Sequence, residues 1–357
     1  MSRFLSEKYI SLKPYVPGEQ PGDKRYIKLN TNESPYPPSP KAIQIVTQGA
    51  AEGLKLYSDP VARKLRKAIS SYYGLDESEV VATNGSDEAL CFAFMAYLGS
   101  GEGIAFPDIS YGFYKVLRDF LGVRSEVIPL KEDFTIDVEA FCKTPYHVVI
   151  ANPNAPTGIP LSLEEVERIV ATNLARLVII DEAYTDFWGK TSIPLIKKYD
   201  NLLVVQTFSK SRSLAGARIG FAAGNRELMR DIDRVRDCVN PYNINTLSEM
   251  LGVAAIEDTE YFSECVAKTV AERDRTAKRL TDIGFEVLPS AANFLFARHK
   301  DIGGKQMYLS LKEEGVLVRH FDVERIKDFA RISIGNSEEM NVFMVKTLKI
   351  LEGVKKK

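Results

Sequence analysis

Three apolar runs in the middle of the chain each end in polar residues, and helix-like segments separate them. The runs cover residues 146–150, 176–180 and 201–206, and residues 163–170 are one of the helix-like segments. Short apolar runs bounded by polar turns predict buried strands, and their alternation with helices predicts a mostly parallel sheet with right-handed crossovers. Because parallel strands end at one edge of a sheet, the sequence predicts an α/β fold with a ligand site at that edge.

Lys210 follows the last of these runs, and Arg218 lies eight positions after it. A lysine amine at a strand end can form a Schiff base with a carbonyl group. The planar guanidinium of Arg218, on a stretch of small residues, suits a phosphate group held near the same strand end. Taken alone, the pair also fits an ordinary solvated surface, so the neighbouring segments must decide between the two interpretations.

The run at residues 176–180 leads directly into Asp181, and Tyr184 follows shortly after. A carboxylate beside a pyridine nitrogen keeps that nitrogen protonated, which makes the ring of pyridoxal phosphate a stronger electron sink. A phenol can hydrogen-bond the O3′ oxygen of the same ring. Asp181 and Tyr184 therefore suit a pyridoxal phosphate ring held next to Lys210.

A possible cradle for the phosphate lies nearer the start of the chain. A strand-like run ends at Thr83, Gly85 and Ser86 form a turn, and Asp87 lies near the start of an apolar helix that runs through Met95. Backbone amides and the helix dipole favour an anion at such a position. The same residues also make a good helix cap, so this motif alone does not establish a phosphate site.

In their order along the chain, these segments resemble a known superfamily. The strings are NGSDEAL, SYGFY, NPNAPTG, DEAY, the Ser-Lys pair with its later arginine, and ARISIGN, and they span nearly the whole sequence. Together they resemble the fold-type I, aspartate-aminotransferase-like enzymes that use pyridoxal phosphate. Within that superfamily, residues 12–19, 27–36 and 57–60 are most similar to histidinol-phosphate aminotransferases.

The resemblance implies pyridoxal 5′-phosphate as cofactor and a role for each matching residue. Lys210 would form the Schiff base and then shuttle a proton as general base and acid, with Asp181 on the pyridine nitrogen and Tyr184 on O3′. Tyr111 would stack on the ring face. The cofactor phosphate would be held by Gly85, Ser86, Asp87, Thr207, Ser209, Arg218 and, across the interface of a homodimer, Tyr57.

One turn departs from the commonest form of the family pattern. That form has asparagine directly before Pro-Thr-Gly as a second partner of O3′, whereas this chain has Ala155 there and Asn154 one position earlier. We assign the role to Asn154, which requires the turn to rearrange before its amide can reach O3′. The alternative is that Asn154 only caps the turn.

Two arginines in strand-like runs of the C-terminal part suit acidic substrates. The resemblance implies that Arg331 meets the carboxylate of glutamate or the phosphate of histidinol phosphate, and that Arg319 helps with the phosphate. Tyr15 and Asn32 would lie near the substrate. Either arginine could instead form a surface ion pair.

The implied reaction is reversible transamination in histidine biosynthesis, from L-histidinol phosphate and 2-oxoglutarate to imidazole-acetol phosphate and L-glutamate. An aromatic amino-acid aminotransferase or a threonine-phosphate decarboxylase would use the same Lys210, Asp181 and Arg218. A more remote alternative is a non-enzymatic regulator that binds pyridoxal phosphate. Nothing before about residue 30 resembles a helix-turn-helix, and the chain has no basic stripe for a nucleic-acid backbone.

Composition agrees with a soluble, cytoplasmic enzyme that binds small molecules. The chain has 45% hydrophobic and 27% charged residues, a net charge of −1, and neither a long apolar span nor a basic block. No membrane, nucleic acid or metal is therefore expected as a partner, and residues 1–8 lack the apolar core of a secretory signal.

The length of 357 residues predicts two lobes. We expect an N-terminal arm at residues 1–29, which packs with the small domain or a partner subunit. A large cofactor-binding domain would follow at residues 30–245. Alternating strands and a final helix predict a smaller α/β domain at residues 246–357.

Overall fold

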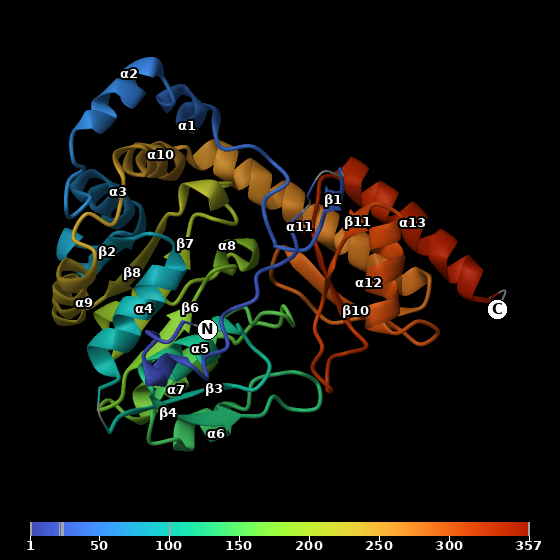
Figure 1. The fold of residues 1–357 in the computed structure, drawn as a ribbon, viewed down its shortest axis with the longest axis horizontal. Coiled ribbons are helices and arrows are strands. Elements are labelled where there is room, and N and C mark those ends of the chain that lie inside the picture. Colours follow the sequence, from blue (N-terminus) through green and yellow to red (C-terminus); the bar gives the residue numbers. More distant parts are fainter. Residues whose placement is uncertain (1, 21, 23–24, 100, 356–357) are drawn as a thin grey trace.

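The computed structural model describes residues 2–20, 22, 25–99 and 101–355, and it shows a large and a small sheet with helices packed around them (Figure 1). The large sheet has seven strands in the order β2-β8-β7-β6-β5-β3-β4. β8 runs opposite to the other strands, and the pairings among β3, β4, β5, β6 and β7 are all parallel. The prediction of a mostly parallel central sheet is therefore confirmed. Its strands are β2 (Val80–Thr83), β3 (Gly103–Pro107), β4 (Arg124–Ile128), β5 (His147–Ala151), β6 (Val178–Asp181), β7 (Leu202–Thr207) and β8 (Gly220–Gly224).

Helices cover both faces of the large sheet, so each central strand is apolar on both sides. In β6, for example, Val178 and Ile180 pack into one hydrophobic core and Ile179 into the other. This alternation follows from the two-residue period of a strand. The helices are α1 (Pro40–Ile45), α2 (Gln48–Glu52), α3 (Arg63–Tyr73), α4 (Ser86–Tyr97), α5 (Phe113–Leu121), α6 (Val138–Lys143), α7 (Leu163–Thr172), α8 (Thr185–Trp188), α9 (Arg226–Val239) and α10 (Thr246–Glu257).

The register of the parallel strands brings the predicted polar residues together. Asp181 pairs with Ala151 on one side and with Val205 on the other, so β5, β6 and β7 end at one edge. The chain leaves β7 at Thr207 and reaches Lys210 shortly afterwards. The three apolar runs thus become neighbouring strands, and their polar continuations meet at the edge where ligands were expected.

The small sheet has the order β12-β13-β10-β9, and all its pairings are antiparallel. The long helix α11 (Thr259–Asp282) connects it to the large sheet (Figure 1). A third pairing joins β1 (Ile27–Lys28) in the N-terminal segment to β11 (Val316–Leu317). The boundaries near residues 29 and 245 stay a prediction. The remaining elements are β9 (Phe285–Val287), β10 (Phe294–His299), β12 (Arg319–His320), β13 (Ala330–Ser333), α12 (Gly304–Glu313) and α13 (Ser337–Lys355), with short 3-10 turns η1 (Glu7–Tyr9), η2 (Gly53–Lys55), η3 (Glu77–Glu79), η4 (Ile193–Lys197) and η5 (Ala215–Ala217).

None of the described helices is both long and apolar enough to cross a membrane.

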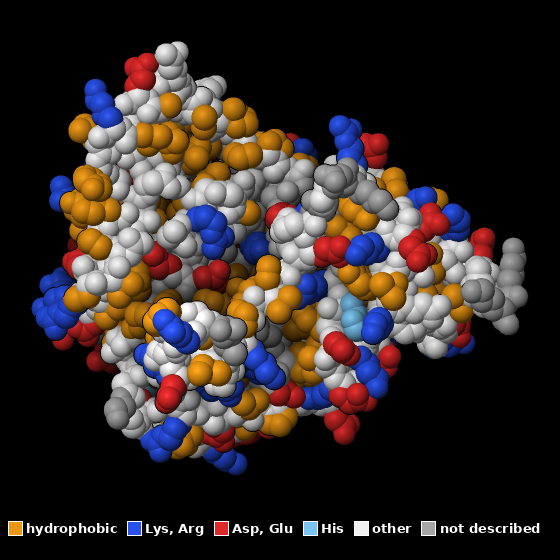
Figure 2. Space-filling model, in the orientation of Figure 1, with side chains coloured by type: hydrophobic (Ala, Val, Ile, Leu, Met, Phe, Trp, Pro, Cys, Tyr) orange, Lys and Arg blue, Asp and Glu red, His pale blue; other side chains and the backbone are white. Residues whose placement is uncertain are grey.

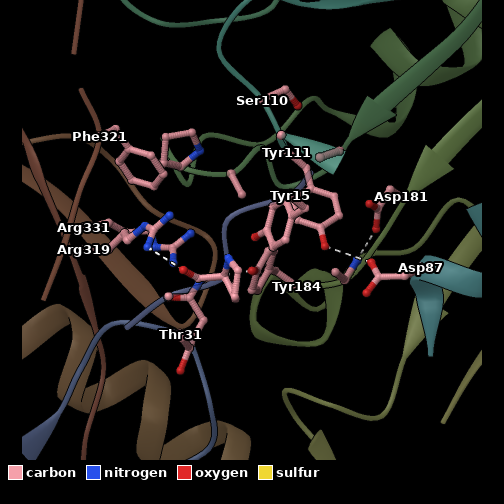
Figure 3. Close-up of a pocket in the computed structure, with 18 of the residues that line it drawn as sticks. Tyr15, Thr31, Asp87, Ser110, Tyr111, Asp181, Tyr184, Arg319, Phe321 and Arg331 are labelled. Carbon is pink, nitrogen blue, oxygen red and sulfur yellow. Dashed lines mark hydrogen bonds between the residues drawn. The ribbon is translucent and has the colours of Figure 1, made fainter. Parts of the chain in front are cut away.

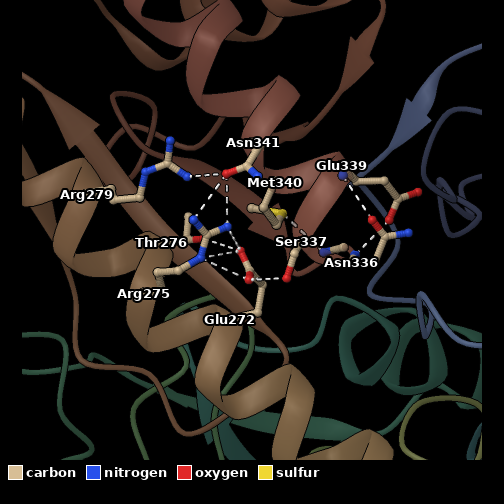
Figure 4. Close-up of polar contacts among 10 residues, drawn as sticks. Glu272, Arg275, Thr276, Arg279, Asn336, Ser337, Glu339, Met340 and Asn341 are labelled. Atoms are coloured by element: carbon tan, nitrogen blue, oxygen red, sulfur yellow. Dashed lines mark hydrogen bonds and ion pairs between the residues drawn. The ribbon is translucent and has the colours of Figure 1, made fainter.

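A polar cluster ties α11 to the start of α13 (Figure 4). Glu272 on α11 is only 5% exposed, and its carboxylate accepts hydrogen bonds from the Ser337 hydroxyl at 2.9 Å and from Arg275 at 2.6 Å. Arg275 also donates to Asn341 on α13 at 3.1 Å. The cluster holds the segment directly after β13 against the helix that connects the two sheets.

Replacing Glu272 should therefore loosen the small sheet from α11. We expect Glu272→Ala to lower the free energy of unfolding by about 1–3 kcal/mol, because Ser337 and Arg275 lose the acceptor they share, the buried carboxylate of Glu272. Urea unfolding followed by circular dichroism would measure this. Glu264→Ala, which breaks an exposed pair with Lys268 on the same helix, is the control and should change little. Equal losses in the two variants would contradict the role of the cluster.

Candidate active site

A cavity of about 430 Å³ lies at the carboxyl ends of the parallel strands and is closed on its other side by strands of the small sheet (Figure 3). Most of the predicted site residues line it. They are Tyr15, Asn32, Ser86, Asp87, Tyr111, Asp181, Tyr184, Thr207, Ser209, Lys210, Arg218, Arg319 and Arg331. Gly85, Asn154 and Tyr57 are not among the lining residues.

Lys210 reaches into the cavity from the loop after β7. Its Nζ donates to the backbone carbonyl of Thr31 at 3.1 Å and lies 5.9 Å from the centroid of the Tyr184 ring. Burial, and to a lesser degree the nearby Arg331, lowers the pKa of Lys210 to about 8. A lysine with this pKa is partly neutral near physiological pH, so its amine can act as a nucleophile or as a base.

Asp181, at the end of β6, is held in one orientation. One carboxylate oxygen accepts from the Tyr114 hydroxyl at 2.7 Å and the other from the backbone N–H of Ala183 at 3.2 Å. Burial raises the pKa of Asp181 to about 6, while the bond from Tyr114 works in the opposite direction. The carboxylate is therefore ionised at neutral pH, and a cation facing it would stabilise it further.

The structure adds Tyr114 to the site, a residue that the sequence interpretation missed. Tyr114 is completely buried on α5 and follows Tyr111, which lies just before this helix, by three positions. The string SYGFY contains both tyrosines, but only Tyr111 was assigned a role. A second tyrosine three positions after a site residue was the available signal, because a phenol that becomes buried needs a hydrogen-bond partner.

Aromatic side chains form one wall of the cavity. Tyr15 packs edge-on against Tyr111 with their centroids 5.8 Å apart, and the Tyr111 hydroxyl donates to Asp87 at 2.8 Å. Tyr184 packs edge-on against Phe294 of β10 at 5.1 Å, and its hydroxyl accepts from the Asn32 amide at 2.9 Å. These contacts fix the orientations of the aromatic rings around Lys210.

One end of the cavity has the features of an anion cradle. Helix α4 starts after Gly85 without a side-chain cap. A Cβ added at Gly220 would lie 2.5 Å from the Gly85 carbonyl carbon and the Ser86 nitrogen, so two backbones meet here without intervening side chains. Arg218 lies beside Gly85 and pairs with Asp87 at 3.4 Å. Free helix amides with an adjacent guanidinium favour a phosphate group.

The opposite end holds two arginines that lie side by side on neighbouring strands of the small sheet (Figure 3). Arg331 on β13 donates to the Asn30 carbonyl at 3.0 Å, and its buried Nε has no hydrogen-bond partner among the described residues. Arg319 on β12 donates to the carbonyls of Val16 and Pro17, each at 3.1 Å. Burial and the neighbouring Arg319 lower the pKa of Arg331. An anionic group would relieve this crowding of positive charge.

Asn154 and Tyr57 lie away from the cavity surface. The Asn154 amide accepts from the Ser110 hydroxyl at 2.8 Å and donates to the Ile109 carbonyl at 3.0 Å and the Thr157 hydroxyl at 3.1 Å. Ala155 faces the cavity instead. Tyr57 is 86% exposed and stacks on Tyr242 with the ring centroids 4.9 Å apart.

Comparisons with known proteins agree with this geometry. The sequence model of the family described as aminotransferase class I and II matches residues 24–346. The chain belongs to this family. It is 47% identical to a histidinol-phosphate aminotransferase from Clostridium acetobutylicum, covering 97% of this chain and 98% of the relative. It is 46% identical to one from Clostridium botulinum strain Hall, covering 98% and 99%.

A solved structure shows the same fold. The histidinol-phosphate aminotransferase from Sinorhizobium meliloti, in complex with pyridoxal-5′-phosphate, aligns with a TM-score of 0.90 over 99% of each chain at 24% identity. The fold-type I architecture expected from the sequence is therefore confirmed. The protein is an aminotransferase, and its family implies pyridoxal phosphate as cofactor.

The residues of the cavity fit this cofactor. The uncapped start of α4 with Arg218 suits its phosphate, the buried carboxylate of Asp181 suits its ring nitrogen, and the amine of Lys210 suits its aldehyde. The close approach of Gly85 and Gly220 leaves the helix amides accessible where a side chain would cover them. Two carboxylates lie in the first turn of α4: Asp87 is paired to Arg218, and Glu88 accepts a hydrogen bond from Asn243.

Filling the cradle should therefore weaken cofactor binding. We expect Gly220→Ala to raise the dissociation constant for pyridoxal phosphate roughly tenfold or more, because its Cβ would push the Gly85–Ser86 backbone out of place. Fluorescence titration of the cofactor-free protein would measure this. Gly216→Ala, at a position with no atom within 4 Å of the added Cβ, is the matched control and should bind like the wild type. Unchanged affinity in Gly220→Ala would argue against the cradle.

Proposed function

We propose that the enzyme transfers the amino group of L-histidinol phosphate to 2-oxoglutarate, giving imidazole-acetol phosphate and L-glutamate. The observation that carries this proposal is the 46–47% identity to histidinol-phosphate aminotransferases over 97–98% of the chain. The arginines at the far end of the cavity support it, because both the phosphate of one donor and the carboxylate of the other are anions.

We assign proton transfer to Lys210 and the protonation of the cofactor's ring nitrogen to Asp181. Bound pyridoxal phosphate would supply a ring that accepts the electron pair left on the reacting carbon. Lys210, with its pKa near 8, is suited to take a proton from that carbon and return it. Asp181 would hold the ring nitrogen protonated, and Tyr111 would cover a ring face.

The remaining assignments concern how the cofactor is held. We propose that its phosphate is bound at the start of α4 by Gly85, Ser86 and Asp87, together with Thr207, Ser209 and Arg218. Asn154 could reach O3′ only by breaking its bonds to Ser110 and Ile109. We therefore propose the second of the two roles considered for Asn154, a support of the turn that presents Ala155 to the cavity.

Substrate recognition would fall to the arginine pair. Arg331 lines the cavity, and its guanidinium can donate to a carboxylate or a phosphate there. Arg319 would be recruited when a phosphate competes with the Val16 and Pro17 carbonyls for its guanidinium. Tyr15 and Asn32 also line the cavity and would border the substrate. One site could then accept donors with different anionic groups.

We also propose a homodimer in which Tyr57 of the partner subunit completes the site. Apolar side chains gather on the surface of α1, α2 and the turn that follows them (Figure 2). They include Ile43, Val46, Leu54 and Leu56, which are 46–70% exposed. A contiguous exposed patch of this kind commonly marks an interface between proteins. A monomer in analytical ultracentrifugation at assay concentration would contradict this.

The low pKa of Lys210 predicts how cofactor uptake depends on pH. Only the neutral amine attacks an aldehyde, and its fraction grows as pH rises through the pKa of about 8. The rate at which cofactor-free protein acquires its visible absorption band should therefore rise between about pH 7 and 9 and then level off. Lys210→Ala should acquire no such band. A rise only near the ordinary lysine pKa of about 10.4 would contradict the desolvated amine.

A coupled assay that detects glutamate tests the substrate directly. With 2-oxoglutarate present, histidinol phosphate should give glutamate at a higher kcat/KM than phenylalanine, and Lys210→Ala should reduce turnover to background. Glutamate from phenylalanine but not from histidinol phosphate would indicate an aromatic amino-acid aminotransferase. Release of carbon dioxide from threonine phosphate would indicate the decarboxylase instead.

A further inference from the structure

Asn32 and Ser333 form a closed pair of hydrogen bonds next to Tyr184. Asn32 lies in the segment after β1, and its φ of 55° is a left-handed conformation that asparagine tolerates better than most residues. This conformation turns both its backbone N–H and its side-chain amide toward the Ser333 hydroxyl, each at 2.8 Å. Both residues are at most 2% exposed, so their hydrogen bonds must be made with other protein groups.

The protons in this pair can be assigned by counting donors. The backbone N–H of Asn32 can only donate, so the Ser333 oxygen accepts there. The single Ser333 proton then goes to the carbonyl oxygen of the Asn32 side chain. This fixes the orientation of the amide, and its NH₂ group donates to the Tyr184 oxygen at 2.9 Å. Tyr184 therefore accepts from Asn32 and keeps its own proton for another acceptor.

The opposite orientation of the amide is less favourable. With the Asn32 side chain flipped, its carbonyl would face Tyr184 and take the phenol proton, while its NH₂ group would face Ser333. The Ser333 hydroxyl would then face two donors, and its proton would have no acceptor at a buried position. Ser333 thus decides in which direction the phenol can donate.

No acceptor for the Tyr184 proton occurs among the described residues, and the side chain lines the cavity beside Lys210. We propose that Asn32 and Ser333 are positioning residues that hold Tyr184 as a hydrogen-bond donor into the cavity, toward the phenolic O3′ oxygen of the cofactor. The inference rests on the proposed cofactor site at Lys210. It means that a residue of the small sheet affects the cofactor site, because Ser333 lies on β13, the strand that also carries Arg331.

The consequence is a change in the acidity of the lysine-bound cofactor. Bound pyridoxal phosphate would supply O3′ as an acceptor, and the protonated nitrogen of Lys210 could donate a hydrogen bond to it. A donor from Tyr184 competes for the electrons of O3′ and so lowers the pKa of the nitrogen. Losing one such bond should raise this pKa by about one unit.

The test is a spectrophotometric pH titration of the cofactor-loaded enzyme, which reports this pKa without any measurement of activity. Ser333→Ala should raise the pKa by about one unit, because the Asn32 amide is then free to turn its carbonyl toward Tyr184. Ser333→Cys keeps the shape of the side chain with a weaker donor, so it should shift the pKa in the same direction if Ser333→Ala folds poorly.

Two controls separate positioning from general damage. Ser337→Ala removes another serine bond shortly after β13, to Glu272, but has no path to Tyr184, so it should leave the pKa unchanged (Figure 4). In a Tyr184→Phe background, Ser333→Ala should no longer shift the pKa, because the hydroxyl through which it acts is gone. None of these variants, apart from the loss of the Tyr184 hydroxyl itself, changes a charged or titratable group that faces Lys210 or Tyr184. Those groups are Glu33, Asp87, Asp181, Arg218, Arg331 and Tyr15.

The outcomes distinguish this inference from the proposed function. An unshifted pKa in both Ser333 variants, or an equal shift in the Tyr184→Phe background, would overturn the positioning role while leaving the cofactor site intact. A wild-type enzyme without a lysine-dependent visible band would overturn both. A shift in Ser333→Ala that disappears with Tyr184→Phe supports the donor assignment.

Discussion

Lys210 can work as a nucleophile and base only because the fold removes its amine from water. Burial is the main cause of its low pKa, and the cation of Arg331 adds to the effect. Both causes require the small sheet to lie against the edge of the large one, since Arg331 comes from β13 and Lys210 from the loop after β7. The chemistry of the lysine thus depends on the packing of two sheets that are far apart in sequence.

Each kind of backbone element contributes a different polar group to the surroundings of Lys210. Parallel strands deliver Asp181 and Lys210 to one edge, and an uncapped helix start delivers free amides to the same edge. The antiparallel small sheet places Arg319 directly opposite Arg331, so two guanidiniums lie together without any local sequence motif. Repulsion between them is tolerable because an anionic substrate would offset it when bound.

Much of this was predictable because it is local in sequence. Apolar runs of strand length predicted β5, β6 and β7, and parallel strands must end together, so Asp181 and Lys210 were expected as neighbours. Tyr114 was missed because its partner Asp181 is 67 positions away. Ser333 was missed for the same reason, since it meets Asn32 across 301 positions. The direction of the Asn154 amide could not be foreseen either, because it depends on Ser110, which is 44 positions earlier.

The choice of substrate must reside in the parts of the cavity that do not hold the cofactor. Asp181, Arg218 and the start of α4 would serve any reaction of pyridoxal phosphate, so they cannot select a donor. What remains is the small sheet with Arg319 and Arg331 and the N-terminal segment that bonds to Arg319 through Val16 and Pro17. Because Ser333 follows Arg331 on the same strand and reaches Tyr184 through Asn32, the strand proposed to meet the substrate anion would also orient the phenol beside Lys210. Selection of the substrate and control of the cofactor would then share one strand, so a small-sheet residue remote from Lys210 in sequence would affect its chemistry.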